Sequence, residues 1–271
     1  MRITSKANER IKLLRAVLSS KKDRVREGLF AVEGDRVIRE AIAAGCLPQV
    51  VLLRDPPRRP EAVQALRQAL QSLSVQAQVL IVDGPVLNDA IDVTASVDAV
   101  ALCPTAAVLA TPAGSLDVSG LLLAIERLQD PGNLGTLLRT AHAAEAKGIV
   151  LVGPCVDPLS PKVVRATAGS LFHVPLALAG SPEEARVALR GVRHVGASAR
   201  DGVAWDRVDL HANVALWLGG EAHGLTAEAR ACCDEWVHIP IAGTADSLNV
   251  AIAAAVLTFE HVRQRRLARP T

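Results

Sequence analysis

Aromatic side chains are scarce in this sequence: its 271 residues include three Phe, three Trp and no Tyr, although half of them are hydrophobic. Ala, Val and Leu must therefore fill the interior, which predicts cores packed from small residues. The length exceeds that of a typical single domain and predicts two domains. With so few rings, extensive stacking on nucleic-acid bases is not expected either.

The sequence also lacks the patterns of metal-binding, disulfide-linked and membrane proteins. Its five cysteines form no C-x-x-C pair and have no histidines at metal-ligand spacing beside them. They are expected to be small apolar residues in a reducing compartment. No hydrophobic run reaches the ~18 residues of a membrane span, and no apolar run follows the basic amino terminus. We therefore expect a cytoplasmic protein with no metal and no membrane partner.

Positive charge is present but unevenly distributed. The net charge of +2 is too small to indicate a nucleic-acid partner by itself, yet residues 1–26 contain nine Lys or Arg and only two acids. Such a cluster fits either contacts with phosphates or an ordinary solvated surface. The candidates for phosphate contacts are Lys6, Arg10, Lys12, Lys21, Lys22 and Arg24.

Hydrophobic periodicity predicts alternating helices and strands along the whole chain. The first part begins with a basic amphipathic helix, and the region 104–120, rich in Ala, Thr, Pro, Gly and Ser, is typical of a connection. From residue 121, apolar strands alternate with helices, which predicts a parallel sheet covered on both faces. The predicted strands of this part are 121–125, 149–152, 172–176, 194–197, 214–218 and 236–241. The predicted domains are 1–105, a linker at 106–119, and 120–271.

The first of three distinctive loops follows the strand at 121–125. Asn133 is expected to cap the next helix, on which Gly135 and Arg139 lie four residues apart on one side. Arg139 would then point back towards the loop. An ordinary capped helix with a surface arginine is the alternative.

The second loop follows the strand at 214–218 and begins with Gly219 and Gly220, followed by Glu221 and Gly224. Paired glycines allow a ligand to approach the backbone closely, and the acid can accept hydrogen bonds. A dinucleotide-binding phosphate loop fits poorly, because the G-x-G-x-x-G spacing is absent and the loop comes late in the chain.

The third loop runs from Ile239 into the last helix. Ser247 is expected to cap that helix and Asn249 to lie on its flank near the start, where it could meet a polar ligand. A plain helix start is the alternative. The buried stripe of the helix is predicted to be Leu248, Ile252, Ala255, Val256 and Phe259.

Together the three loops resemble the motifs of the SpoU/TrmH family of RNA 2′-O-ribose methyltransferases, within the SPOUT superfamily. The order and spacing agree across 120–271, and the segment 30–44 resembles the family's small α/β substrate-binding domain. The residues that carry the resemblance are Asn133, Gly135 and Arg139, then Leu218, Gly219, Glu221 and Gly224, then Ile239, Pro240, Ser247, Leu248, Asn249 and Val250.

The resemblance implies a carboxyl-terminal trefoil-knotted α/β SPOUT domain and a smaller amino-terminal α/β RNA-binding domain. It implies S-adenosylmethionine as the cofactor and rRNA or tRNA as the substrate. The cofactor would be held mainly by backbone groups of Leu218, Gly219, Gly220, Ile239, Ile241, Leu248 and Asn249.

The resemblance also places Arg139 at the ribose hydroxyl. An always-charged guanidinium is a poor base, so whether it removes the proton or only positions the hydroxyl stays open. Asn133, Glu221, Ser247 and Asn249 would support it, and a second subunit would complete the site, which implies a homodimer with the last helix in its interface. Lys162 and Arg165 are further candidates for contacts with RNA.

Two other functions remain possible for such a chain. A SPOUT enzyme that methylates a base nitrogen is disfavoured by the Asn133–Arg139 motif, which belongs to the ribose-modifying branch. A ribosome-assembly factor that binds RNA without catalysis would keep the fold but not consume the cofactor. A nicotinamide-dependent enzyme is the most distant alternative, because its glycine fingerprint is missing.

Overall fold

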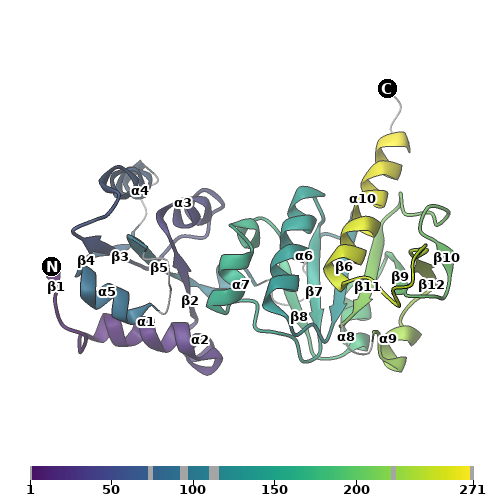
Figure 1. The fold of residues 1–271 in the computed structure, drawn as a ribbon, viewed down its shortest axis with the longest axis horizontal. Coiled ribbons are helices and arrows are strands. Elements are labelled where there is room, and N and C mark those ends of the chain that lie inside the picture. Colours follow the sequence, from purple (N-terminus) through teal and green to yellow (C-terminus); the bar gives the residue numbers. More distant parts are fainter. Residues whose placement is uncertain (1, 73–75, 92–96, 110–115, 221–223, 269–271) are drawn as a thin grey trace. The chain divides into compact units, whose positions relative to one another are not determined.

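The computed structural model describes residues 2–72, 76–91, 97–109, 116–220 and 224–268. The chain divides into two compact units (Figure 1). The first consists of residues 1–108 together with 157–172, and the second of residues 109–156 and 173–271. Residues 157–172, which fall in the predicted carboxyl-terminal domain, are thus part of the first unit.

The first unit is built on a mixed five-stranded sheet in the order β1-β4-β3-β5-β2. Strands β1, β4 and β3 run parallel, whereas β5 runs antiparallel to both of its neighbours. The strands are β1 (Arg2–Ile3), β2 (Leu29–Glu33), β3 (Val50–Asp55), β4 (Gln78–Asp83) and β5 (Ala99–Pro104). The helices are α1 (Glu9–Ser19), α2 (Lys21–Glu27), α3 (Asp35–Ala43), α4 (Pro60–Ser72), α5 (Gly84–Ala90) and α7 (Pro161–Ala166).

The basic amphipathic helix predicted at the start of the chain is confirmed as α1. Its apolar face, with Ile11, Leu14 and Val17, is fully buried in a core that includes Leu52 and Leu102. The packing of this face, rather than the helix-forming tendency of a short basic segment, stabilises the helix.

The second unit is built on a seven-stranded sheet in the order β10-β12-β9-β11-β6-β7-β8, in which every neighbouring pair is parallel. The predicted parallel sheet is therefore confirmed here. The strands are β6 (Leu121–Glu126), β7 (Gly148–Val152), β8 (Leu176–Ala179), β9 (Arg193–Ser198), β10 (Val203–Ala204), β11 (Val214–Gly219) and β12 (Glu235–His238). The helices are α6 (Pro131–Ala143), α8 (Pro182–Ala188), α9 (Ala227–Ala231) and α10 (Val250–Ala268). The strand predicted at 172–176 starts too early, since residues 170–172 form a 3₁₀ turn.

The last helix, α10, buries a different face from the predicted one. Its buried face contains Val250, Ala254 and Leu257, whereas Ile252 and Phe259 of the predicted stripe are 51% and 48% exposed. The helix carries apolar residues on two sides, so its periodicity alone did not show which side faces the sheet.

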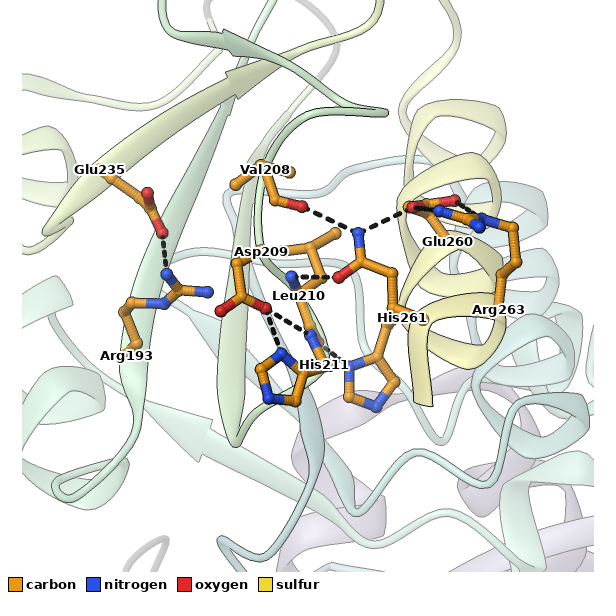
Figure 2. A network of polar contacts seen from close by, with 10 residues as sticks. Arg193, Val208, Asp209, Leu210, His211, Glu235, Glu260, His261 and Arg263 are labelled. Atoms are coloured by element: carbon orange, nitrogen blue, oxygen red, sulfur yellow. Dashed lines mark hydrogen bonds and ion pairs between the residues drawn. The ribbon is translucent and has the colours of Figure 1, made fainter. Parts of the chain in front are cut away.

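The carboxyl-terminal half of α10 is fastened to the loop at 208–211 by side-chain to backbone hydrogen bonds (Figure 2). Gln264 accepts from the Leu210 amide at 2.6 Å and donates to the Val208 carbonyl at 2.8 Å. His261 Nδ1 lies 2.5 Å from the Leu210 carbonyl oxygen, and burial lowers the pKa of this imidazole. These bonds fix α10, whose first turns form part of the site described next.

Candidate functional site

A cavity of about 580 Å³ lies where the carboxyl ends of β9, β11 and β12 meet the start of α10. These three strands are neighbours in the parallel sheet, and open α/β sheets place ligands at this edge. The cavity is lined mainly by glycine and aliphatic residues. All seven residues predicted to bind the cofactor lie in its wall: Leu218, Gly219, Gly220, Ile239, Ile241, Leu248 and Asn249.

The two glycines at the end of β11 are required by the chain itself. A Cβ atom on Gly219 would lie 1.9 Å from the carbonyl carbon of Gly224, and one on Gly220 would lie 2.6 Å from the Arg127 carbonyl oxygen. The Gly224 amide donates to the Gly220 carbonyl at 3.1 Å and closes the turn. Glycine is therefore required at both positions whether or not a ligand binds there, because the neighbouring backbone segments leave no room for a side chain.

A buried carboxylate fixes the chain just after this turn. Glu126, at the end of β6, is 3% exposed and accepts hydrogen bonds from the amide and hydroxyl of Thr226 at 2.8 and 2.7 Å. Thr226 in turn caps α9. Glu126 was missed in the sequence, because it lies at the polar end of an apolar strand.

The caps of the two helices that flank the site differ from those expected. Asp130, not Asn133, caps α6, accepting from the Asn133 amide at 2.7 Å. Asn249, not Ser247, accepts from the amides of Ala251 and Ile252 at the start of α10. Asn249 also donates to the Asn133 side chain at 3.0 Å, which links the first and third predicted motifs.

The remaining predicted catalytic residues lie in different places. Ser247 lines the cavity, whereas Arg139 lies on the exposed face of α6 and is not among the lining residues. Glu221 lies outside the described residues. The chain as described therefore brings Asn133, Ser247 and Asn249 together without Arg139.

Part of the cavity wall was missed in the sequence. Residues 197–199 form the end of β9 and the position after it, and Arg230 comes from α9. The Arg230 guanidinium lies 3.9 Å from the ring centroid of Trp236 and pairs with Asp201 at 3.1 Å. The end of a third parallel strand was the available signal for 197–199, whereas nothing in the sequence indicated Arg230.

The thiols of the second unit are poor nucleophiles. Burial raises the pKa of Cys233 to about 12 and raises the pKa of Cys155 and Cys232. A thiolate is the reactive form of cysteine, so these side chains behave as small apolar residues, as expected.

The predicted RNA-binding cations lie in the first unit, and most of them are on its surface. Lys6, Lys12, Lys21, Lys22 and Lys162 are exposed, as is Arg165, while Arg10 is half-buried. Arg24 is the exception, because its side chain is only 7% exposed. It pairs with Asp157 at 2.5 Å and donates to the Val17 carbonyl at 2.6 Å. Arg24 therefore stabilises the unit, and little of its side chain is accessible for the RNA contact predicted for it.

The described residues contain no cluster of three or more His, Cys, Asp or Glu side chains that could hold a metal ion. None of the helices in the described part of the chain is long and apolar enough to cross a membrane.

A parallel α/β sheet whose carboxyl edge holds a cavity lined by residues of the second and third motifs, with the first motif bonded to it through Asn133, defines the class of the SpoU methyltransferases. Residues 120–259 match the model of the SpoU rRNA Methylase family, and residues 8–105 match an MRM3-like substrate binding domain. The chain belongs to the SpoU rRNA methylase family.

Relatives along the full length agree with this assignment. The chain is 30% identical to the 23S rRNA (guanosine(2553)-2′-O)-methyltransferase of Bacillus subtilis over 96% of this chain and 98% of that protein. It superposes on the AdoMet-bound rRNA methyltransferase of Sinorhizobium meliloti with a TM-score of 0.86 and 31% identity, covering 100% and 99% of the two chains. For the AdoMet complex of the SpoU methyltransferase AviRb from Streptomyces viridochromogenes, the TM-score is 0.82 at 29% identity, covering 96% and 100%.

Proposed function

We propose that this protein transfers the methyl group of S-adenosylmethionine to a ribose 2′-hydroxyl of a structured RNA, with ribosomal RNA as the favoured substrate. The carrying observation is that all seven residues taken from the family's cofactor motifs line one cavity. The relatives and neighbours named above support the same activity, being 2′-O-methyltransferases of 23S rRNA or AdoMet-bound methyltransferases.

The cavity fits the proposed cofactor in size and in chemistry. Its volume of about 580 Å³ falls within the range of small-molecule sites. Main-chain groups at Leu218, Ile239 and Ile241 can bond a polar adenine edge, while their side chains offer an apolar wall. When bound, S-adenosylmethionine supplies an electrophilic methyl group and its own leaving group.

The protein must then orient the ribose and help its hydroxyl lose a proton. Arg139 is proposed to meet the hydroxyl and a neighbouring phosphate, where its charge stabilises developing alkoxide character. The linked Asn133 and Asn249 side chains hold the starts of α6 and α10 at the site. Ser247 and Glu221 are proposed to supply further hydrogen-bonding groups.

A homodimer is part of this proposal. Arg139 is exposed on α6 and does not line the cavity of its own chain, which fits a site completed by the arginine of a second subunit. The exposed apolar residues Leu248, Ile252 and Phe259, at the start and along one side of α10, offer an interface of the expected kind. The proposal also includes the family's trefoil knot and a cytoplasmic location, where ribosomal RNA is accessible.

Methyl transfer from labelled S-adenosylmethionine to an unmodified 23S rRNA transcript tests the function. Arg139→Ala should lower kcat by roughly 10²–10⁴-fold while cofactor affinity stays unchanged, because the arginine acts at the ribose. Arg190→Ala, which removes an exposed arginine of the same unit, is the control and should transfer at the wild-type rate.

The product distinguishes the other functions. Label on a base nitrogen would indicate a base methyltransferase, and RNA binding without cofactor binding would indicate an assembly factor. Undiminished turnover by Arg139→Ala would remove this arginine from the mechanism.

A further inference from the structure

Two buried acids of the first unit each hold an arginine at the surface. Glu33 ends β2 and Asp35 begins α3, so the two flank Gly34, and their side chains are only 4% and 5% exposed. Glu33 pairs with Arg165 of α7 at 2.9 Å, and Asp35 pairs with Arg59 at 2.6 Å. Arginines from distant parts of the sequence are thereby fixed beside the start of one helix.

A third buried acid fixes the loop that carries Arg58 and Arg59. Asp98 is 1% exposed and accepts hydrogen bonds from the backbone amides of Arg58 at 3.0 Å and of Arg59 at 2.8 Å. Both carboxylate oxygens of Asp98 accept from backbone amides. The loop before α4 is therefore held by its main chain, and these bonds do not involve the side chain of Arg58.

The arginines held in this way still present donors to solvent. The side chain of Arg59 is 58% exposed despite its ion pair, and Arg39, which lies 3.9 Å from Asp35, is also exposed in part. A guanidinium has five N–H donors, and these contacts engage only one or two of them. The remaining donors are already oriented, which lowers the entropic cost of binding a ligand.

Two further arginines at this place are exposed. The ion pairs of the described residues here involve Arg39, Arg59 and Arg165, and none involves Arg36 in the first turn of α3 or Arg58 in the loop. Gly34, with φ of 92°, gives α3 no side-chain cap, so the positive end of the helix adds to the same field. We call Arg36, Arg39, Arg58, Arg59 and Arg165 the arginine face.

The basic amino terminus, predicted above to contact RNA, is arranged differently. Lys6 and Arg15 share the surface carboxylate of Asp89, and Lys12 pairs with the exposed Glu9. These pairs neutralise flexible cations at the surface instead of fixing them for a ligand. Among the cations of residues 2–26, Lys21 and Lys22 are exposed like Arg36 and Arg58, and the described residues give them no ion pair.

We propose that the arginine face is the surface by which the first unit binds the phosphates of its RNA substrate. This inference rests on the proposed function, since it assigns a binding surface to the same reaction. The chemistry favours RNA phosphate because a guanidinium fork matches two phosphate oxygens, and because several fixed forks can follow successive phosphates of a folded backbone.

Two double variants that remove the same charge test the proposal. Arg36→Gln with Arg58→Gln is compared with Lys21→Gln with Lys22→Gln, and affinity for an unmodified 23S rRNA transcript is measured over a range of KCl concentrations. The arginine variant should bind on the order of tenfold more weakly, and its log–log salt slope should be smaller by about 1.5, because two phosphate contacts are lost. The lysine variant should lose less affinity than the arginine variant, within about twofold of wild type, because a lysine ammonium is a flexible point charge without the planar fork of arginine.

The outcomes separate this inference from the proposed function. Equal affinity of the arginine variant and wild type, or a larger loss in the lysine variant, would overturn the arginine face while methyl transfer by the wild type upholds the function. A wild-type chain that neither binds the transcript nor methylates it would overturn both. Cofactor affinity and the unfolding midpoint of both variants should equal the wild-type values, which shows that a loss of RNA affinity is local.

Discussion

The proposed ligand-binding surfaces of the two units are built from different kinds of groups. In the first, buried carboxylates hold arginine side chains outward, as Asp35 holds Arg59. In the second, the cavity is lined mainly by glycine and aliphatic residues, and the buried acid Glu126 accepts hydrogen bonds from the amide and hydroxyl of Thr226. A charged side-chain surface suits a long polyanion, and a backbone-lined cavity suits one small cofactor. Affinity for RNA and affinity for the cofactor should therefore respond to separate substitutions.

The largest effect on binding is expected from a single methyl group added in the second unit. Gly219→Ala would place its Cβ 1.9 Å from the Gly224 backbone, so the turn at the end of β11 must move. Cofactor affinity should fall on the order of a hundredfold, since moving packed backbone costs a few kcal/mol. Isothermal titration with S-adenosylmethionine measures this, and RNA affinity should be unchanged.

Gly243→Ala is the matched control for that substitution. A Cβ on Gly243 meets no atom within 4 Å, and the residue lies in the loop that leads to α10. Its cofactor affinity should equal that of the wild type. If Gly219→Ala bound the cofactor normally, the turn would not shape the site, and the contrast between the units would weaken.

In the first unit, the largest effect should come from the buried cation Arg24. Arg24→Ala leaves Asp157 without its buried partner and the Val17 carbonyl without a donor. The free energy of unfolding should fall by about 3 kcal/mol, as is usual when one partner of a buried pair is removed. Urea denaturation, followed by a probe in the first unit, measures the loss.

The neighbouring Arg26 provides the control for Arg24. Its side chain is 61% exposed and pairs with Asp23 and Glu27 at the surface, so Arg26→Ala should change stability by less than about 1 kcal/mol. Equal effects of the two substitutions would mean that the buried pair is not structural, and Arg24 would again be a candidate for contacting RNA.

The sequence predicted the parallel sheet and the three loops because continuous apolar runs and glycine-rich strand ends are local signals. The antiparallel strand β5 was missed, since its apolar residues precede a loop rich in Pro and Gly and its partners β2 and β3 are distant in sequence. The predicted buried face of α10 was wrong for a related reason. Both apolar sides of this helix have helical spacing, and only tertiary packing determines which side is buried.

The residues of the arginine face show a further limit of the sequence. Arg39, Arg59 and Arg165 are scattered among other charged residues, and nothing in their spacing indicates that Glu33 and Asp35 gather them. The dense amino-terminal cluster attracted the prediction instead. Clustering in sequence measures local charge, whereas a binding surface depends on which cations the fold brings together and leaves exposed.

The smallest effect is expected at Asn249, which links the first and third predicted motifs. Asn249 caps α10 through its oxygen and donates to Asn133 through its nitrogen, so two substitutions can separate these roles. Asn249→Ala removes both and should lower the free energy of unfolding by about 1 kcal/mol. Asn249→Asp keeps the cap, because aspartate caps about as well as asparagine, and should restore stability to within a few tenths of a kcal/mol. It cannot donate to Asn133, however, and should leave methyl transfer slower than in the wild type at saturating cofactor. If Asn249→Asp restored both stability and kcat, the side chain would act only as a cap, and the second unit would hold its site by backbone geometry alone.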